Sequence, residues 1–311
     1  MAARQQTLQT STELGATNMS KPVIGFIGLG LMGGNMVENL QKRGFHVNVM
    51  DLNQDAVDAV LARGNASQMS TPKELAEQSD IIQFCVTTSE VVEKLVYGED
   101  GVLAGIQEGS VLIDFGTSIP ASTQKIGAEL AAKGAGMLDA PLGRTPAHAK
   151  DGLLNIMAAG DKATFDKYEP ILKEQGENVF YLGKLGAGHV TKLINNFMGM
   201  TTVTAMSQAF AAAELAGVDR AQLYDIMSAG PSNSPFMKFC KNYAVDGVSD
   251  LGFSMNNANK DLRYFVQMMS DLGTRSLVAE GTSESLQAAV AKGMGDGNVP
   301  EIFDYFVDLK K

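Results

Sequence analysis

A lysine and two asparagines stand out because they lie in an otherwise apolar stretch of the chain. The run from Val190 to Ala216 contains no proline and is typical of one long, largely buried helix. Within it, Lys192 and Asn196 are four residues apart and share a helix face, and Asn195 is adjacent. Burying a lysine there costs free energy through lost hydration, unless an anionic group or a bound ligand compensates for it. Lys192 is therefore a candidate ligand-facing residue, and a structural lysine that is salt-bridged or reaches solvent is the alternative.

A glycine-rich turn near the start of the chain is a second candidate site. It reads Gly28-Leu29-Gly30-Leu31-Met32-Gly33, the G-x-G-x-x-G pattern, between an expected strand over 23–27 and an expected helix over 31–43. Such glycines permit a tight turn and let backbone N–H groups approach a pyrophosphate at the positive end of the helix. These six residues are predicted to bind a dinucleotide, and the alternative is a glycine turn that serves the fold alone.

An acidic residue ends the next expected strand, which covers 46–50. Asp51 lies 23 residues after Gly28, where a carboxylate accepts hydrogen bonds from the ribose hydroxyls of NAD and repels a 2′-phosphate. Leu52 and Asn53 follow it, and no arginine does. The sequence favours NAD over NADP, and the alternative role for Asp51 is to cap an expected helix over 54–62.

Strands and helices continue to alternate through the first half of the chain. Expected strands cover 81–86, 111–115, 137–140, 153–159 and 178–182, and expected helices cover 90–97, 121–133 and 163–175. This alternation predicts a parallel, doubly wound sheet whose ligands lie at the carboxyl ends of the strands. Val86 and Thr87 close one of these strands and Thr117 follows another, and we expect them to line the nicotinamide side of the site.

An arginine follows the strand over 137–140, in the loop Asp139-Ala-Pro-Leu-Gly143-Arg144-Thr145. A guanidinium there offers a planar fork to a carboxylate, sulfonate or phosphate. We expect Gly143, Arg144 and Thr145 to contact a substrate, and a surface arginine is the alternative.

Strand patterns stop after residue 182. Expected helices cover 190–216, 220–229, 257–272, 282–292 and 300–309, with a turn at 232–235. The predicted organisation is a flexible extension over 1–19, an α/β Rossmann domain over 20–185 and an all-α domain over 186–311. The many apolar helix faces of the second domain indicate packing against another subunit of the same chain.

The charge and the cysteine content limit the classes of partner that the protein is expected to bind. The net charge is -10 and the pI is about 4.8, which argues against binding to nucleic acid or to an anionic membrane. Cys85 and Cys240 have no metal-ligand spacing, so we expect no metal and a reducing, cytoplasmic setting.

Four motifs occur in one order: GFIGLGLMG, DAPLGRT, GAGHVTKLINN and KDL. Together they resemble the β-hydroxyacid dehydrogenases, the family of the 3-hydroxyisobutyrate, tartronate semialdehyde and 6-phosphogluconate dehydrogenases. The resemblance covers nearly all of 22–309. It implies an N-terminal Rossmann domain, a helical C-terminal domain and NAD(P)-dependent interconversion of a hydroxy acid and its oxo form, commonly in dimers or tetramers.

The resemblance also implies roles for individual residues. The family pattern G-x-x-x-K-x-x-x-N falls on Gly188, Lys192 and Asn196. Lys192 is then the proton donor and acceptor for the substrate oxygen, and Asn196 orients the substrate. Lys260 of the KDL motif is expected near the nicotinamide or the substrate, and Thr117 near the cofactor.

One motif departs from the family pattern. Most members have Ser-Gly-Gly where this chain has Gly143-Arg144-Thr145. This form, and the paired Asn195 and Asn196, look like the branch that contains 3-sulfolactaldehyde reductase, where the arginine meets a sulfonate. The expected substrate is small and anionic, similar to 3-sulfolactaldehyde. The alternatives are 3-hydroxyisobutyrate or tartronate semialdehyde and, from another class of protein, a non-catalytic NAD-binding scaffold.

Overall fold

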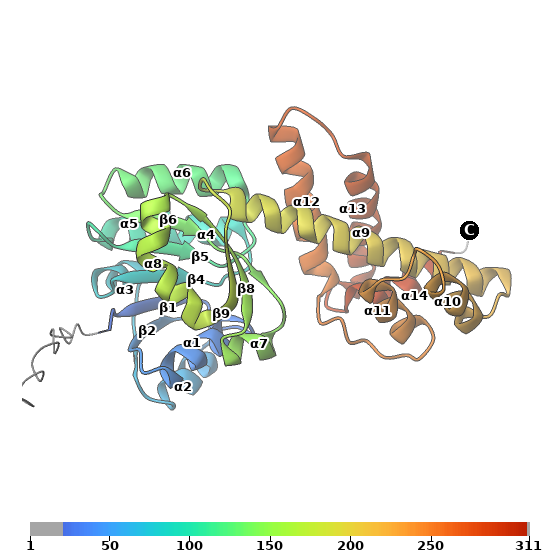
Figure 1. Cartoon of the computed structure of the whole chain (residues 1–311), viewed down its shortest axis with the longest axis horizontal. Helices are drawn as coiled ribbons and strands as arrows, with labels where there is room; N and C mark the ends of the chain where they lie inside the picture. The colour runs from blue at the N-terminus through green and yellow to red at the C-terminus, as the bar shows by residue number, and fades with distance from the viewer. Residues whose placement is uncertain (1–20, 310–311) are drawn as a thin grey trace, which may run out of the picture.

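The computed structural model describes residues 21–309, so the extension expected over 1–19 lies outside the described residues. A sheet covered by helices forms one half of the molecule and a group of helices forms the other (Figure 1). The 30-residue helix α9 (Ala187–Ala216) leaves the sheet half and runs through the helical half. The predicted fold class is confirmed. The boundary between 185 and 186 stays a prediction, with α9 beginning beside it.

The sheet has the strand order β3-β2-β1-β4-β5-β6-β8-β7, with β9 paired to β8. Its strands are β1 (Ile24–Ile27), β2 (Val47–Met50), β3 (Ala66–Gln68), β4 (Ile81–Phe84), β5 (Val111–Asp114), β6 (Gly136–Asp139), β7 (Leu142–Gly143), β8 (Leu154–Gly160) and β9 (Gly176–Tyr181). The strands from β3 to β6 are parallel, and β1, β4 and β5 are buried along their whole length. Continuous apolar strands are expected where helices cover both faces of a sheet.

One edge of the sheet departs from the predicted parallel arrangement. Strand β8 runs antiparallel to β6 and to β7. The chain between β6 and β8 forms only the two-residue strand β7 and the six-residue helix α7 (Pro146–Asp151), which packs against α1. Because this connection does not cross a face of the sheet, β8 returns in the opposite direction.

Two helical layers cover the sheet. These helices are α1 (Gly33–Lys42), α2 (Gln54–Leu61), α3 (Pro72–Glu77), α4 (Ser89–Tyr97), α5 (Val102–Gly105), α6 (Pro120–Ala131) and α8 (Lys162–Gln175). One apolar core joins the sheet to α1 and α8 through Met36, Leu40 and Leu172. A second core on the other face joins it to α3 and α6 through Leu75 and Ile126. The sheet is therefore doubly wound, an arrangement in which ligands bind at the carboxyl ends of the strands.

The helical half packs around α9. Its other helices are α10 (Arg220–Ser228), α11 (Pro235–Ala244), α12 (Met255–Asp271), α13 (Leu277–Ala289), a π-turn (Val290–Met294), a 3-10 turn (Val299–Glu301) and α14 (Ile302–Asp308). Helix α11 was not predicted, although Ser234 caps it and Pro235 is its first residue. Within the described residues, no helix is long and apolar enough to span a membrane.

Candidate functional site

The three glycines of the G-x-G-x-x-G loop differ in what surrounds them. Gly28 has a φ of +100°, and a Cβ built on it would lie 2.4 Å from the carbonyl oxygen of Cys85. A Cβ on Gly33 would lie 1.9 Å from the carbonyl oxygen of Gly28, whereas a Cβ on Gly30 would meet nothing within 4 Å. Packing therefore requires the first and third glycines, and the space in front of Gly30 fits the close approach of a ligand to the backbone.

The loop also offers free hydrogen-bond donors. Among the described residues, no partner accepts a hydrogen bond from the N–H groups of Gly30, Leu31 and Met32, just before α1 begins. Such N–H groups at the positive end of a helix fit a pyrophosphate. The side chains in the loop differ: Leu29 is buried in the core, and Leu31 is 82% exposed.

Asp51 lies beside this loop at the end of β2. Its Oδ2 accepts a hydrogen bond from the N–H of Leu29 at 2.5 Å, and its Oδ1 accepts one from the N–H of Asn53 at 2.8 Å. Asn53, not Asp51, caps α2, because its side chain accepts from the N–H of Asp55 at 3.0 Å. The carboxylate of Asp51 thus joins the glycine loop to the position where an adenine ribose is expected.

The residues predicted on the nicotinamide side follow neighbouring strands. Val86 and Thr87 follow β4 and Thr117 follows β5, and all three are at least partly exposed. Lys260, in the first turns of α12, donates from Nζ to the carbonyl oxygen of Thr87 at 2.7 Å. The two halves of the molecule meet through this contact at the carboxyl edge of the sheet.

Lys192 lies in the second turn of α9 and is partly buried. Its Nζ donates to the carbonyl oxygen of Leu142 at 2.6 Å, in the segment that follows β6. Burial lowers the pKa of Lys192, because desolvation disfavours the ammonium form; the carboxylate of Asp261 opposes this shift and the ammonium of Lys260 adds to it. A lysine in this state can release and regain a proton more easily than one in water.

A buried carboxylate that sequence reasoning missed organises this face of α9. Asp261 Oδ2 accepts from Nδ2 of Asn196 at 2.6 Å, and Asp261 Oδ1 lies 3.1 Å from Nζ of Lys260. Asp261 is 3% exposed, and Asn195 is exposed beside Asn196. A continuous chain of contacts therefore links Thr87 to Asn196 through Lys260 and Asp261. The signal in the sequence was an acid next to Lys260 on a helix with a strong apolar face.

The guanidinium of Arg144 has protein partners in this structure. It donates from Nη1 to the carbonyl oxygen of Leu153 at 2.7 Å and forms an ion pair with Glu177 in β9. The backbone of Arg144 has a φ of +78°, which is uncommon for a residue with a side chain. Thr145 Oγ1 lies 2.7 Å from Nδ1 of His148. An anionic substrate that binds Arg144 would have to compete with Glu177.

Gly188 explains how closely α9 approaches the sheet. A Cβ on Gly188 would lie 2.4 Å from the carbonyl oxygen of Met157 and 2.8 Å from that of Asp139. Only a glycine lets the first turn of α9 pack directly on β6 and β8, which brings Lys192 to the carboxyl edge of the sheet.

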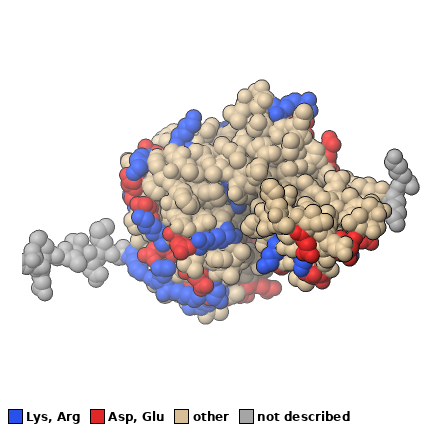
Figure 2. All heavy atoms as spheres, turned by 45° about the vertical axis from the view of Figure 1, so that its right-hand side comes forward, with Lys and Arg blue, Asp and Glu red and all other residues tan. Residues whose placement is uncertain are grey.

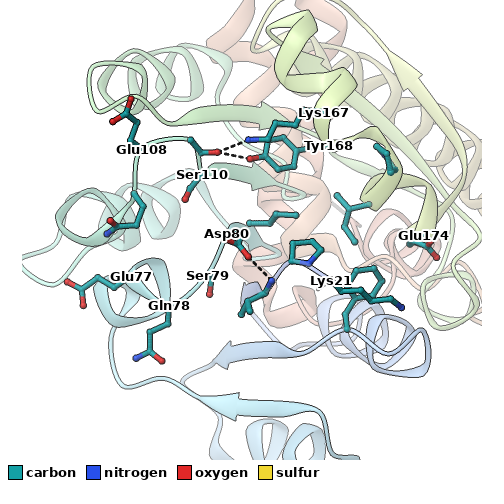
Figure 3. Close-up of a pocket in the computed structure, with 18 residues that line it drawn as sticks. Lys21, Glu77, Gln78, Ser79, Asp80, Glu108, Ser110, Lys167, Tyr168 and Glu174 are labelled. Atoms are coloured by element: carbon teal, nitrogen blue, oxygen red, sulfur yellow. Dashed lines mark hydrogen bonds between the residues drawn. The ribbon is translucent and has the colours of Figure 1, made fainter. Parts of the chain in front are cut away.

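A hollow in the surface lies away from the predicted site. It has a volume of about 1020 Å³ and lies where β1, β4 and β5 begin, the edge of the sheet opposite to the predicted site (Figure 3). Lys167 and Tyr168 both donate to the carbonyl oxygen of Gly109 there, and Asp80 accepts from the N–H of Val23. No residue predicted to bind cofactor or substrate lines it. Within residues 21–309 no group of three His, Cys, Asp or Glu side chains could hold a metal ion.

The fold and the site define a class of enzyme, an oxidoreductase that binds NAD(P) and acts on CH–OH groups. Residues 23–183 match the family described as the NAD-binding domain of 6-phosphogluconate dehydrogenase. Residues 186–306 match the family described as NAD-binding of NADP-dependent 3-hydroxyisobutyrate dehydrogenase. The chain belongs to the β-hydroxyacid dehydrogenase family, as its motifs predicted.

Named relatives cover most of the chain. An NAD-dependent L-serine dehydrogenase of Pseudomonas aeruginosa is 33% identical over 84% of this chain and 87% of its own length. A 3-sulfolactaldehyde reductase of Escherichia coli is 30% identical over 88% of this chain and 91% of its own. The crystal structure of a 3-hydroxyisobutyrate dehydrogenase from Salmonella typhimurium has a TM-score of 0.80 at 26% identity, covering 92% of this chain and 100% of that one. These relatives act on different small hydroxy acids or semialdehydes.

Proposed function

We propose that the protein interconverts a small anionic hydroxy acid and its oxo form, with Lys192 as the residue that moves the proton. The observation that carries this proposal is the position of Lys192, whose Nζ lies at the carboxyl edge of the sheet, 2.6 Å from the carbonyl oxygen of Leu142. Burial there also lowers its pKa, as suits a residue that moves a proton. The nicotinamide, when bound, supplies or accepts the hydride. For reduction, the ammonium of Lys192 donates a hydrogen bond and then a proton to the carbonyl oxygen, and for oxidation the neutral amine accepts a proton from the alcohol.

The residues around Lys192 position the substrate. Asn196 shares a face of α9 with Lys192, and its Nδ2 is held by Asp261. Its Oδ1 accepts from Nδ2 of Asn195 at 3.4 Å and has a second lone pair for a ligand. Lys260 fixes the loop after β4 through Thr87. This arrangement restricts the orientation of a bound substrate, which favours one near-attack geometry over many.

We assign NAD as the preferred cofactor. The support is Asp51, whose carboxylate lies at the end of β2 next to the glycine loop and would repel a 2′-phosphate. Replacing Asp51 with alanine is expected to relax the preference for NADH over NADPH, measured as the ratio of the two kcat/KM values. An unchanged ratio would remove Asp51 from cofactor selection.

A substrate with a sulfonate, similar to 3-sulfolactaldehyde, is our first candidate. Its support is Arg144 in the loop after β6 and the 30% identical 3-sulfolactaldehyde reductase. A guanidinium binds a sulfonate or carboxylate with two parallel hydrogen bonds. Such a substrate would replace Glu177 as the partner of Arg144.

A simple carboxylate substrate, such as L-serine, 3-hydroxyisobutyrate or tartronate semialdehyde, is the second candidate. The pairing of Arg144 with Glu177 favours it, because the guanidinium is then neutralised within the protein and a smaller ligand need not reach it. The 33% identical L-serine dehydrogenase also supports this candidate.

A panel of substrates separates the two candidates. It would contain sulfolactaldehyde, methylmalonate semialdehyde, tartronate semialdehyde and succinate semialdehyde with NADH, and L-serine with NAD, each with the wild type and with Arg144→Ser. For the first candidate, the variant raises KM at least ~10-fold for sulfolactaldehyde only, the scale of a lost charge-assisted pair. Equal effects on all of these substrates would show that Arg144 does not select for the sulfonate, and no turnover of any substrate would contradict the proposed function.

A further inference from the structure

A histidine that the proposed chemistry does not use lies at the junction of the three segments that form the site. His189 is 0% exposed in the first turn of α9. Its Nδ1 lies 2.8 Å from Oγ1 of Thr123 and 3.9 Å from Oδ2 of Asp139, and its Nε2 lies 3.6 Å from Oδ2 of Asp114. Both carboxylates are also fully buried. The imidazole is thus placed between two acids that come from neighbouring strands, β5 and β6.

Asp114 organises the loop that carries Thr117. Its Oδ1 accepts a hydrogen bond from the N–H of Gly116 and its Oδ2 accepts one from the hydroxyl of Ser118, both at 2.8 Å. These two bonds enclose Thr117, the residue expected near the cofactor. Any shift of Asp114 relative to His189 therefore moves the loop after β5 relative to α9.

Asp139 joins the second segment to the start of the same helix. Its Oδ1 and Oδ2 accept from the N–H groups of Gly186 and His189, both at 2.7 Å, so the carboxylate caps α9. Burial raises the pKa of Asp139, and the neighbouring His189 side chain and these N–H groups oppose the rise. Three residues beyond Asp139, the carbonyl oxygen of Leu142 holds Nζ of Lys192.

The hydrogen-bond geometry of His189 is not that expected for a residue whose only role is packing. Its Nε2 is buried and has no hydrogen-bond partner among the described residues, although Asp114 lies just beyond hydrogen-bond distance. Buried polar atoms without partners are costly, so an apolar side chain would suit a purely packing role better. The remaining explanation is positional, since the imidazole lies between Thr123, Asp139 and Asp114 and so spans the segments that carry them.

We propose that His189 is a positioning residue that holds the loop after β5 and the segment after β6 against the first turn of α9. It thereby fixes Nζ of Lys192 relative to Thr117. This inference rests on the proposed function, in which Lys192 moves the proton. It adds a residue that touches neither substrate nor cofactor but controls the distance between the groups that do.

The test compares His189→Asn and His189→Gln with the control His46→Asn. His46 also bonds a hydroxyl group, that of Ser67 at 3.1 Å, but it is exposed and lies at the start of β2. With the best substrate of the panel, we expect kcat to fall at least ~10-fold in His189→Asn while KM for NADH changes less than ~3-fold. His189→Gln, whose longer side chain carries a donor toward Asp114, should recover part of kcat. The control should match the wild type.

A second readout does not depend on turnover. Amide hydrogen exchange of the NADH-bound protein should quicken at least ~10-fold at residues 116–118 and 187–192 together in His189→Asn, with β1 unchanged. If kcat per folded molecule equals the wild-type value, or if exchange stays unchanged or quickens over the whole chain, His189 is only a structural residue. If the wild type turns over no substrate, the proposed function is wrong, and the exchange result still decides whether His189 holds the three segments together.

Discussion

The chemistry of a single residue, Lys192, depends on two charged neighbours with opposite effects. Burial lowers the pKa of its ammonium, Asp261 raises it and Lys260 lowers it. Asp261 also bonds Asn196 and pairs with Lys260, so one carboxylate tunes the proton donor and fixes the residues around it. A general acid works best when its pKa lies near the working pH, and this arrangement moves a lysine in that direction.

The pH dependence of reduction should report these effects. Reduction requires the protonated form of Lys192, so kcat/KM should fall as the pH rises through its pKa, at a pH below the ordinary lysine value of about 10.4. Lys260→Met removes a positive charge, which raises the pKa of Lys192 and moves this fall to higher pH. Asp261→Asn removes a negative charge, which lowers that pKa and moves the fall to lower pH.

Both shifts are measured in one series of pH-rate profiles with the wild type and the two variants. The direction of each pH shift is a better test than its size, because each variant also disturbs a hydrogen bond. Shifts in the same direction for both variants, or no shift in either, would show that another group controls the pH dependence.

At the scale of elements, we expect two glycines of the same loop to have different roles, Gly30 in binding the cofactor and Gly33 in stabilising the fold. Gly30→Ala should fold with an unchanged melting temperature, because its Cβ meets no atom within 4 Å, but should weaken NADH binding at least ~10-fold by entering the ligand space. Gly33→Ala should destabilise the protein by about 1 to 3 kcal/mol, because its Cβ would overlap the carbonyl oxygen of Gly28. Thermal unfolding and a fluorescence titration with NADH measure the two effects.

The opposite pattern, in which Gly30→Ala unfolds and Gly33→Ala only loses NADH binding, would contradict this account of the loop. Equal binding of NADH by Gly30→Ala and the wild type would show that the open space does not face the cofactor.

Local sequence patterns were sufficient to predict most helices and strands, because each of these elements has a characteristic pattern of its own. The strands β1, β4 and β5 are short apolar runs, and α9 is a long run without proline, so spacing alone predicts them. Helix α11 was missed because its polar start, Ser232 to Ser234, was interpreted as a turn alone. The reversal of β8 could not be predicted, since a short apolar run does not show in which direction its strand will pair.

The site could be predicted only in part, because local patterns do not show contacts between residues far apart in the sequence. The spacing in the sequence correctly placed Lys192 and Asn196 on one face of a helix. The contacts of Arg144 with Glu177 and of Asn196 with Asp261 join residues 33 and 65 positions apart, and no local pattern shows which side chain a charge will meet. The neighbours of His189 could not be predicted either, because Asp114 and Asp139 lie in strands far from it in the sequence.

At the scale of the whole molecule, apolar side chains remain exposed on the helical half. Ile194 and Met198, one turn apart on α9, are 47% and 59% exposed. Residues other than Lys, Arg, Asp and Glu cover much of the helical half on the face shown in Figure 2. We propose that this face of α9 packs against a second copy of the chain in a homodimer or homotetramer, since soluble monomers rarely expose such patches without a partner.

Light scattering after size-exclusion chromatography tests this proposal. The wild type should have at least twice the mass of one 33.0 kDa chain, and Met198→Glu should shift it toward the monomer. Val91→Glu is a matched control, because Val91 is exposed on α4 in the sheet half. A monomeric wild type, or equal masses for Met198→Glu and the wild type, would contradict an interface through this part of α9.

The central claim is that a nicotinamide-dependent hydroxy-acid dehydrogenase uses Lys192 to move the proton. The most direct measurement is kcat for the best substrate of the panel with the wild type, with Lys192→Ala and with Lys238→Ala, an exposed lysine on α11. We expect Lys192→Ala to lower kcat at least ~10²-fold, the usual scale for a lost general acid, while its affinity for NADH and the kcat of Lys238→Ala stay at wild-type values. Full turnover by Lys192→Ala would contradict the claim.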